Sequence, residues 1–240
     1  THLVSGGETL TIAGIDIHII NAPSELDDEI AVWIPKQKVM FVADTIGGAG
    51  PYAATPRAEE GRDPEAFFQT LDNLSSYNPH YIIPGHGRGV LGKDDVHTVM
   101  TNARDTIQYM IDHIVRSMGK AIPRDEIVSS IELPPHLANS KDLGWYYHPM
   151  EWVARGIYAR IAGWMGDDPV ELFATNINKR AELFINDLGG INSALIKSKR
   201  AAKNDNYAWA TEIANAVLQL ERNNEIANEL VVTSLRTQAY

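Results

Sequence analysis

Two carboxylates and one imidazole, Glu25, Asp44 and His86, each end an apolar run or lie in the turn directly after one. Carboxylate oxygens and imidazole nitrogens bind zinc, and the end of a strand is a rigid place from which to aim a side chain. Because the chain has no cysteine, a bound metal could be held only by His, Asp, Glu or water. These three residues are therefore the candidate metal ligands.

Each candidate also has a plainer interpretation. Asp44 could be an ordinary turn or capping aspartate, since aspartate favours turns. Glu25 begins an acidic run that ends at Glu29, and clustered like charges usually face water. His86 could be a simple loop histidine, but the glycines on both sides of it let the backbone turn sharply and approach an ion closely. His86 is therefore the most specific of the three, and the other histidines, which lack ligand spacing, are interpreted as structural or surface residues.

The elements that must position these side chains fall into two regions of different pattern. Over residues 8–43, alternating and β-branched apolar residues separated by turn signals predict four strands. A helix is expected over 63–77, with Asp63 as its N-cap, and a short strand is expected over 81–83. After Gly92, apolar residues at three- and four-residue spacing predict a long amphipathic helix, and nearly everything that follows is typical of helices. We therefore place a domain boundary near residue 92.

Composition excludes several functional classes. The net charge of −10 argues against a nucleic-acid binder, because neutralising phosphates requires clustered Lys and Arg. No apolar stretch reaches the roughly 20 residues that a membrane helix needs. The first residues lack the basic and apolar regions of a signal peptide, and the absence of an initiator Met predicts a processed or truncated piece. The compartment stays open, with a periplasmic or secreted location favoured.

The motifs around the candidate ligands resemble the second half of a metallo-β-lactamase fold. That fold has a Thr-Pro-Gly-His-type turn, a hairpin that ends in aspartate, and a strand that leads into Pro-Gly-His-Gly. This chain reads Ala22-Pro23-Ser24-Glu25 at the first turn, and the segment from Pro23 to Glu29 is similar to that of class III alkylsulfatases. The resemblance implies a site for two zinc ions that is held partly by Glu25, Asp44 and His86 and supported by Glu29. Asp44 departs from the alkylsulfatases, which place glutamate there, but aspartate is the wider superfamily's choice and should still bridge the ions.

Two further segments resemble the same family. The segment from Tyr52 to Arg57 resembles a Tyr-Thr-x-Arg segment that lines the sulfate pocket, so Tyr52, Thr55 and Arg57 are expected to hold sulfate oxygens. The helical region resembles the alkylsulfatase dimerisation domain, which implies a homodimer and places Tyr147 and Arg155 within reach of the substrate. The alternatives are a surface position for Arg57 and packing or dimer contacts for the other two.

The resemblance implies an α+β fold. Residues 1–92 would form half of an αββα sandwich, and residues 93–240 would form an all-helical, tetratricopeptide-like dimerisation domain. The implied activity is zinc-dependent hydrolysis of alkyl sulfate esters. This chain lacks the His-x-His-x-Asp-His motif of the family's first half, so we expect activity only in combination with an N-terminal half chain that supplies it. Two alternatives stay open: a non-catalytic assembly module, and a metallohydrolase of a phosphodiester, lactone or thioester.

Overall fold

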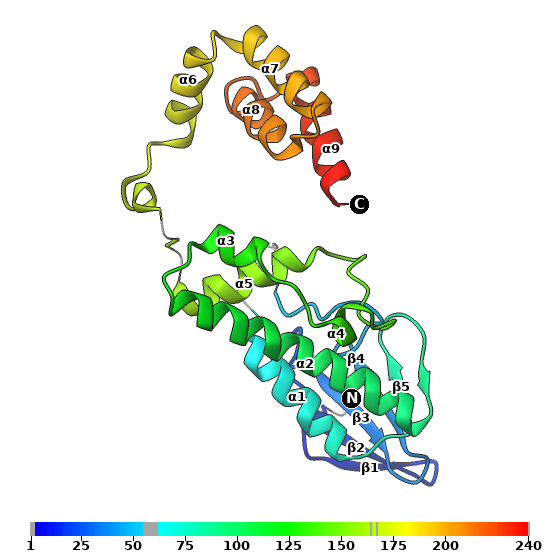
Figure 1. Ribbon diagram of the computed structural model, residues 1–240. Coiled ribbons are helices and arrows are strands. Elements are labelled where there is room, and N and C mark those ends of the chain that lie inside the picture. Colours follow the sequence, from blue (N-terminus) through cyan, green and yellow to red (C-terminus); the bar gives the residue numbers. More distant parts are fainter. Residues whose placement is uncertain (1–2, 55–61, 164, 167, 240) are drawn as a thin grey trace. The chain divides into compact units, whose positions relative to one another are not determined.

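The structure is a computed structural model, and it describes residues 3–54, 62–163, 165–166 and 168–239. The chain forms two compact units, Thr1–Asp168 and Pro169–Tyr240. The first unit contains the β-sheet and helices α1 to α5, and the second contains helices only (Figure 1).

The sheet of the first unit has six strands in the order of the sequence. The strand bounds are β1 (Thr9–Ile12), β2 (Ile15–Asn21), β3 (Ile30–Ile34), β4 (Val39–Ala43), β5 (Tyr81–Pro84) and β6 (Val90–Leu91). Neighbouring strands are antiparallel, except that β4 and β5 are parallel. A parallel pair needs a crossover connection, and the chain between these two strands contains α1 (Pro64–Ser76). The carboxyl ends of β4 and β5 consequently lie at the same edge of the sheet.

Helix α1 and the long helix α2 (Lys93–Met118) pack side by side over one face of the sheet (Figure 1). Asp63 caps α1, since its carboxylate accepts hydrogen bonds from the backbone N–H groups of Glu65 and Ala66 at 3.0 and 3.3 Å. The covered face and α1 bury large side chains in one core, and burial of this kind is the main force that holds the layers together. The core between these layers includes Trp33, Met40, Val42, Phe67, Leu71, Leu74 and Ile82.

The opposite face of the sheet also carries apolar side chains. Val32, Phe41 and Ile83 are neighbours across three adjacent strands, and they alternate with the residues of the covered face. Val32 and Ile83 are half-buried, and Phe41 is 42% exposed. The described chain therefore covers this second face only in part.

The rest of the first unit is helical. It consists of α3 (Arg124–Ser129), α4 (Pro135–Ala138) and α5 (Met150–Ala162), and α3 and α5 pack on each other and on α2. The close contact between α5 and the loop after β4 is made at Gly156, where an added Cβ would lie 2.1 Å from the Ala54 Cβ. This contact ties the helical part of the unit to the sheet.

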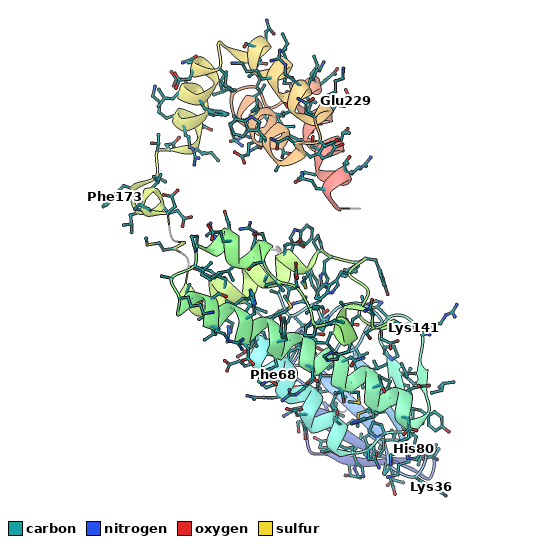
Figure 2. The ribbon with its side chains drawn as sticks, in the orientation of Figure 1. Lys36, Phe68, His80, Lys141, Phe173 and Glu229 are labelled. Atoms are coloured by element: carbon teal, nitrogen blue, oxygen red, sulfur yellow. The ribbon has the colours of Figure 1, made fainter. Side chains whose placement is uncertain are left out.

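The second unit is an array of helices with a core of its own. Its elements are η1 (Pro169–Phe173), α6 (Ile177–Asp187), α7 (Ile191–Lys203), α8 (Tyr207–Leu220) and α9 (Glu225–Ala239). Helix α8 packs on α6, α7 and α9, and its buried residues Ile213 and Val217 meet Ile185 and Leu195 in the core. The ring of Phe173 on η1 is 93% exposed (Figure 2).

The structure confirms the predicted class, a sheet region with one helical layer followed by a helical region. This arrangement is the half of an αββα sandwich that the sequence predicted. The compact units divide after Asp168 instead of residue 92, because α2 buries its apolar stripe against α1. The boundary near residue 92, between the half sandwich and the helical dimerisation domain, stays a prediction. Within the described ranges, no helix is long and apolar enough to cross a bilayer.

Candidate functional site

A pocket of about 550 Å³ opens in the first unit, at the edge of the sheet where β4 and β5 end. Its lining includes all three predicted metal ligands, Glu25, Asp44 and His86, and two of the predicted substrate-binding residues, Tyr52 and Tyr147. The structure thus brings together residues that are far apart in the sequence.

Asp44 and His86 meet because their strands are parallel neighbours. Asp44 directly follows β4, His86 follows β5 after one glycine, and the His86 Nε2 lies 3.6 Å from the Asp44 Oδ1. Gly85 permits this approach: its N–H donates to the Ala43 carbonyl at 2.6 Å, and an added Cβ would lie 2.6 Å from the Asp44 Oδ1. The His86 side chain is 81% exposed, so one side of the pair is open.

Glu25 forms an ion pair in this structure. Its Oε2 lies 3.0 Å from the Nη1 of Arg62, whose side chain is only 3% exposed. The same Nη1 donates to the Tyr52 carbonyl at 2.7 Å, and the guanidinium carbon lies 4.5 Å from the centre of the Tyr52 ring. Arg62 therefore links a predicted metal ligand to a predicted substrate-binding residue.

Glu29 holds the backbone at two of the predicted ligands. Its Oε1 accepts from the Asp44 N–H at 2.7 Å, and its Oε2 accepts from the Glu25 N–H at 3.1 Å. The Ser24 hydroxyl also donates to Oε2 and lies 3.1 Å from the Thr45 hydroxyl. One carboxylate thereby fixes the turn before β3 and the end of β4 to each other. The role of Glu29 in supporting a metal site stays a prediction.

The other predicted substrate-binding residues are Thr55, Arg57 and Arg155. Thr55 and Arg57 lie outside the described residues. Arg155 does not line the pocket; its Nη1 lies 2.8 Å from the Asp125 Oδ1, and this hydrogen bond lowers the pKa of the Asp125 carboxyl. The predicted contact between Arg155 and the substrate stays a prediction.

Two residues next to the pocket, Arg62 and His148, were not predicted to have a role there. His148 is 3% exposed, and its ring stacks on that of Tyr52, with centroids 4.4 Å apart. Burial lowers the pKa of His148, although nearby backbone groups of Pro149 and Gly50 oppose the shift. No local sequence pattern marked the burial of either His148 or Arg62.

The charge of the described lining favours a cation. Glu25, Asp44 and Asp142 contribute three carboxylates, and the described lining residues include no Lys or Arg. Within the described ranges, however, no group of three His, Asp or Glu residues is arranged to hold a metal ion. The described chain therefore offers part of a cation site, with the Asp44 and His86 pair as its closest donors.

Comparisons with known proteins agree on one family. Residues 124–240 match the family described as alkyl sulfatase dimerisation. A linear primary-alkylsulfatase of a Pseudomonas species is 32% identical over 232 residues, which are 96% of this chain and 44% of that protein. An (R)-specific secondary-alkylsulfatase of Pseudomonas is 24% identical over 238 residues, 97% of this chain and 36% of that protein.

A solved structure shows the same fold. The stereoselective inverting sec-alkylsulfatase Pisa1 from Pseudomonas superposes with a TM-score of 0.88 at 24% identity, over 97% of this chain and 37% of that chain. The chain spans less than half of the length of each of these relatives.

Proposed function

Because residues 124–240 match the family described as alkyl sulfatase dimerisation, and the chain resembles an alkylsulfatase over nearly its whole length, we propose that it is part of a zinc-dependent hydrolase of alkyl sulfate esters. The observation that carries this proposal is the pocket in which Glu25, Asp44 and His86 come together beside Tyr52 and Tyr147. The same family supports a homodimer formed through the helical domain.

The donors present fit zinc in type and charge. Asp44 and His86 offer an oxygen and a nitrogen that are 3.6 Å apart, and Glu25 lines the same pocket. These three residues would hold part of a two-zinc site, in which bound metal lowers the pKa of water and polarises the ester. Since each zinc ion takes about four ligands, three residues cannot complete two coordination shells. The other ligands must come from outside these residues.

The partly exposed second face of the sheet supports a partner that supplies the missing ligands. Val32, Phe41 and Ile83 form an apolar patch on the face opposite α1 and α2. An apolar sheet face must be buried against another layer in a stable fold. An N-terminal half with a second sheet would cover this face, complete the sandwich and bring the His-x-His-x-Asp-His motif to the open side of His86.

Within the pocket, different residues of this chain would bind the sulfate group and the alkyl chain of the substrate. Tyr52, with Thr55 and Arg57, would hold the sulfate oxygens, because a guanidinium and hydroxyl groups match those acceptors. The apolar lining would contact the alkyl chain of the substrate, since burial of methylene groups is favourable. The aliphatic lining residues are Ile46, Ala49, Pro51, Val99 and Ala103.

The test is hydrolysis by the assembled protein, formed by producing this chain together with the segment that carries the histidine motif. Release of inorganic sulfate from a linear alkyl sulfate is measured beside release of phosphate from the matching alkyl phosphate. We expect sulfate release that a chelator abolishes. Asp44→Asn should lower the rate by more than the roughly 10–100-fold loss typical of an outer-shell partner.

The matched control is Asp28→Asn, which removes an exposed carboxylate of the same acidic region and should leave the rate unchanged. An assembled protein that binds no zinc and hydrolyses neither ester would contradict the proposal and favour a non-catalytic assembly module. Faster release of phosphate would identify a hydrolase of another ester.

A further inference from the structure

A buried histidine lies directly behind two residues that line the pocket. The His148 ring meets the Tyr52 ring in a near-parallel stack, at 4.4 Å and 19°, and meets the Tyr147 ring edge-on at 5.9 Å. Trp145 contacts it from another side, with centroids 5.4 Å apart. His148 is therefore enclosed by aromatic rings, two of which belong to the lining of the pocket.

Contacts with aromatic rings are the main interactions of this side chain, and the backbone groups of Pro149 and Gly50 interact with it only weakly. Among the described residues, neither ring nitrogen of His148 makes a close, well-aligned hydrogen bond, although the side chain is almost fully buried. Burying a donor without a partner costs about 1–3 kcal/mol. Contacts with three rings offset part of this cost, since aromatic pairs stabilise beyond the area that they bury.

The surroundings favour an uncharged ring. The Arg62 guanidinium already lies 4.5 Å from the centre of the Tyr52 ring. A proton on His148 would add a second buried cation beside the same ring, and both burial and the Arg62 charge oppose it. As a neutral ring, His148 can pack closely against Tyr52 without repulsion from Arg62.

Tyr52 and Tyr147 come from different segments of the chain, so contacts between these segments are required to hold the two rings in place. Tyr52 lies in the loop after β4, and Tyr147 lies in the segment before α5. Hydrogen bonds join these segments nearby: the Gly50 N–H donates to the Gly144 carbonyl at 3.1 Å, and the Tyr146 hydroxyl donates to the Gly48 carbonyl. The rings of Tyr52 and Tyr147 themselves meet edge to face at 5.5 Å, and His148 contacts both.

We propose that His148 is a positioning residue, which fixes the Tyr52 and Tyr147 rings as the aromatic wall of the pocket and thereby sets its affinity for substrate. This inference rests on the proposed function for its substrate, an alkyl sulfate. Because His148 acts through two binding residues and does not line the pocket itself, its loss should raise KM and leave kcat nearly unchanged.

The experiment compares His148→Ala with His148→Phe in the assembled protein. Loss of the ring contacts in His148→Ala should raise the KM for a linear alkyl sulfate about threefold to tenfold, the range expected for aromatic pairs. His148→Phe keeps a ring of similar size and should restore KM to within about twofold of the original value. The control is His80→Ala, because His80 precedes β5, at the opposite end of that strand from His86 (Figure 2).

A second readout uses this chain alone and does not depend on activity. In NMR spectra of protein with labelled tyrosine rings, the Tyr52 and Tyr147 signals should shift in His148→Ala and return toward their original positions in His148→Phe. Unchanged tyrosine signals in His148→Ala, or an unchanged KM, would overturn the proposal, and so would a folded His148→Phe that is as impaired as His148→Ala. If the assembled protein hydrolyses no alkyl sulfate, the proposed function fails, and the tyrosine signals still decide the role of His148.

Discussion

Replacing Glu29 by Gln should loosen the backbone at two pocket residues at once. The carboxylate of Glu29 accepts hydrogen bonds from the N–H groups of Asp44 and Glu25 and from the Ser24 hydroxyl. Glutamine has nearly the same size, but one of its two terminal atoms is an NH₂ group, which cannot accept a hydrogen bond. Whichever way the amide turns, at least one backbone N–H of a predicted metal ligand loses its acceptor.

The expected size of the effect follows from these contacts. A hydrogen bond to a charged group contributes about 1.5–3 kcal/mol, and the remaining bonds weaken when the acceptor loses its charge. Glu29 is only half-buried, so water can replace part of what is lost. We therefore expect Glu29→Gln to lower the free energy of unfolding of the first unit by about 2–3 kcal/mol.

Urea unfolding measured by tryptophan fluorescence provides the assay, since Trp33 and Trp145 both lie in the first unit. Asp28→Asn is the matched control, and as an exposed substitution it should change stability by less than about 0.5 kcal/mol. In the assembled protein, Glu29→Gln should also weaken zinc binding by roughly 10–100-fold. Equal stability of the two variants would refute the role of Glu29 as the link between the two turns.

Three further predictions follow from close contacts and burial. Gly156→Ala should destabilise the first unit by about 1–3 kcal/mol in the same urea assay, whereas Gly47→Ala, whose added carbon meets nothing within 4 Å, should not. Gly85→Ala should displace the Asp44 carboxylate and weaken zinc binding at least about tenfold in a calorimetric titration; equal affinity would contradict the geometry. Because the folded state lowers the pKa of His148 below its ordinary 6.5, the unfolded state binds the proton more tightly, and stability should fall as pH drops below that value. In urea titrations at several pH values this fall should be smaller in His148→Phe, and an identical pH dependence would refute the assignment.

Local sequence patterns predicted the strands and helix ends that are determined mainly by neighbouring residues. Apolar alternation predicted β1 to β4, and Asp63 followed by Pro64 predicted the start of α1 within one residue. The grouping of Asp44 with His86 came from the resemblance to a known fold, because placement at strand ends does not by itself show that the two strands are parallel neighbours. Strand β6 has only two residues, too few for a periodic pattern, and it was missed.

The tertiary features could not be predicted in this way. Arg62 pairs with Glu25, which is distant in the sequence, and no local pattern marks a buried arginine in a loop. His148 was interpreted as structural or surface, and its contact with Tyr52 depends on how the segment before α5 meets the loop after β4. The boundary between the two compact units depends on the packing of α2 against α1. An amphipathic stripe predicts that one face of a helix is buried, but it does not predict which element covers that face.

The most direct test of the central claim, that Glu25, Asp44 and His86 form one side of a zinc site that a second segment completes, is the zinc content of the assembled protein in native mass spectrometry. We expect two zinc ions for each copy of the complete site, and loss of zinc when Asp44→Asn and His86→Ala are combined. An assembled protein that hydrolyses alkyl sulfates with no zinc bound, or a double variant that keeps both ions, would contradict the claim.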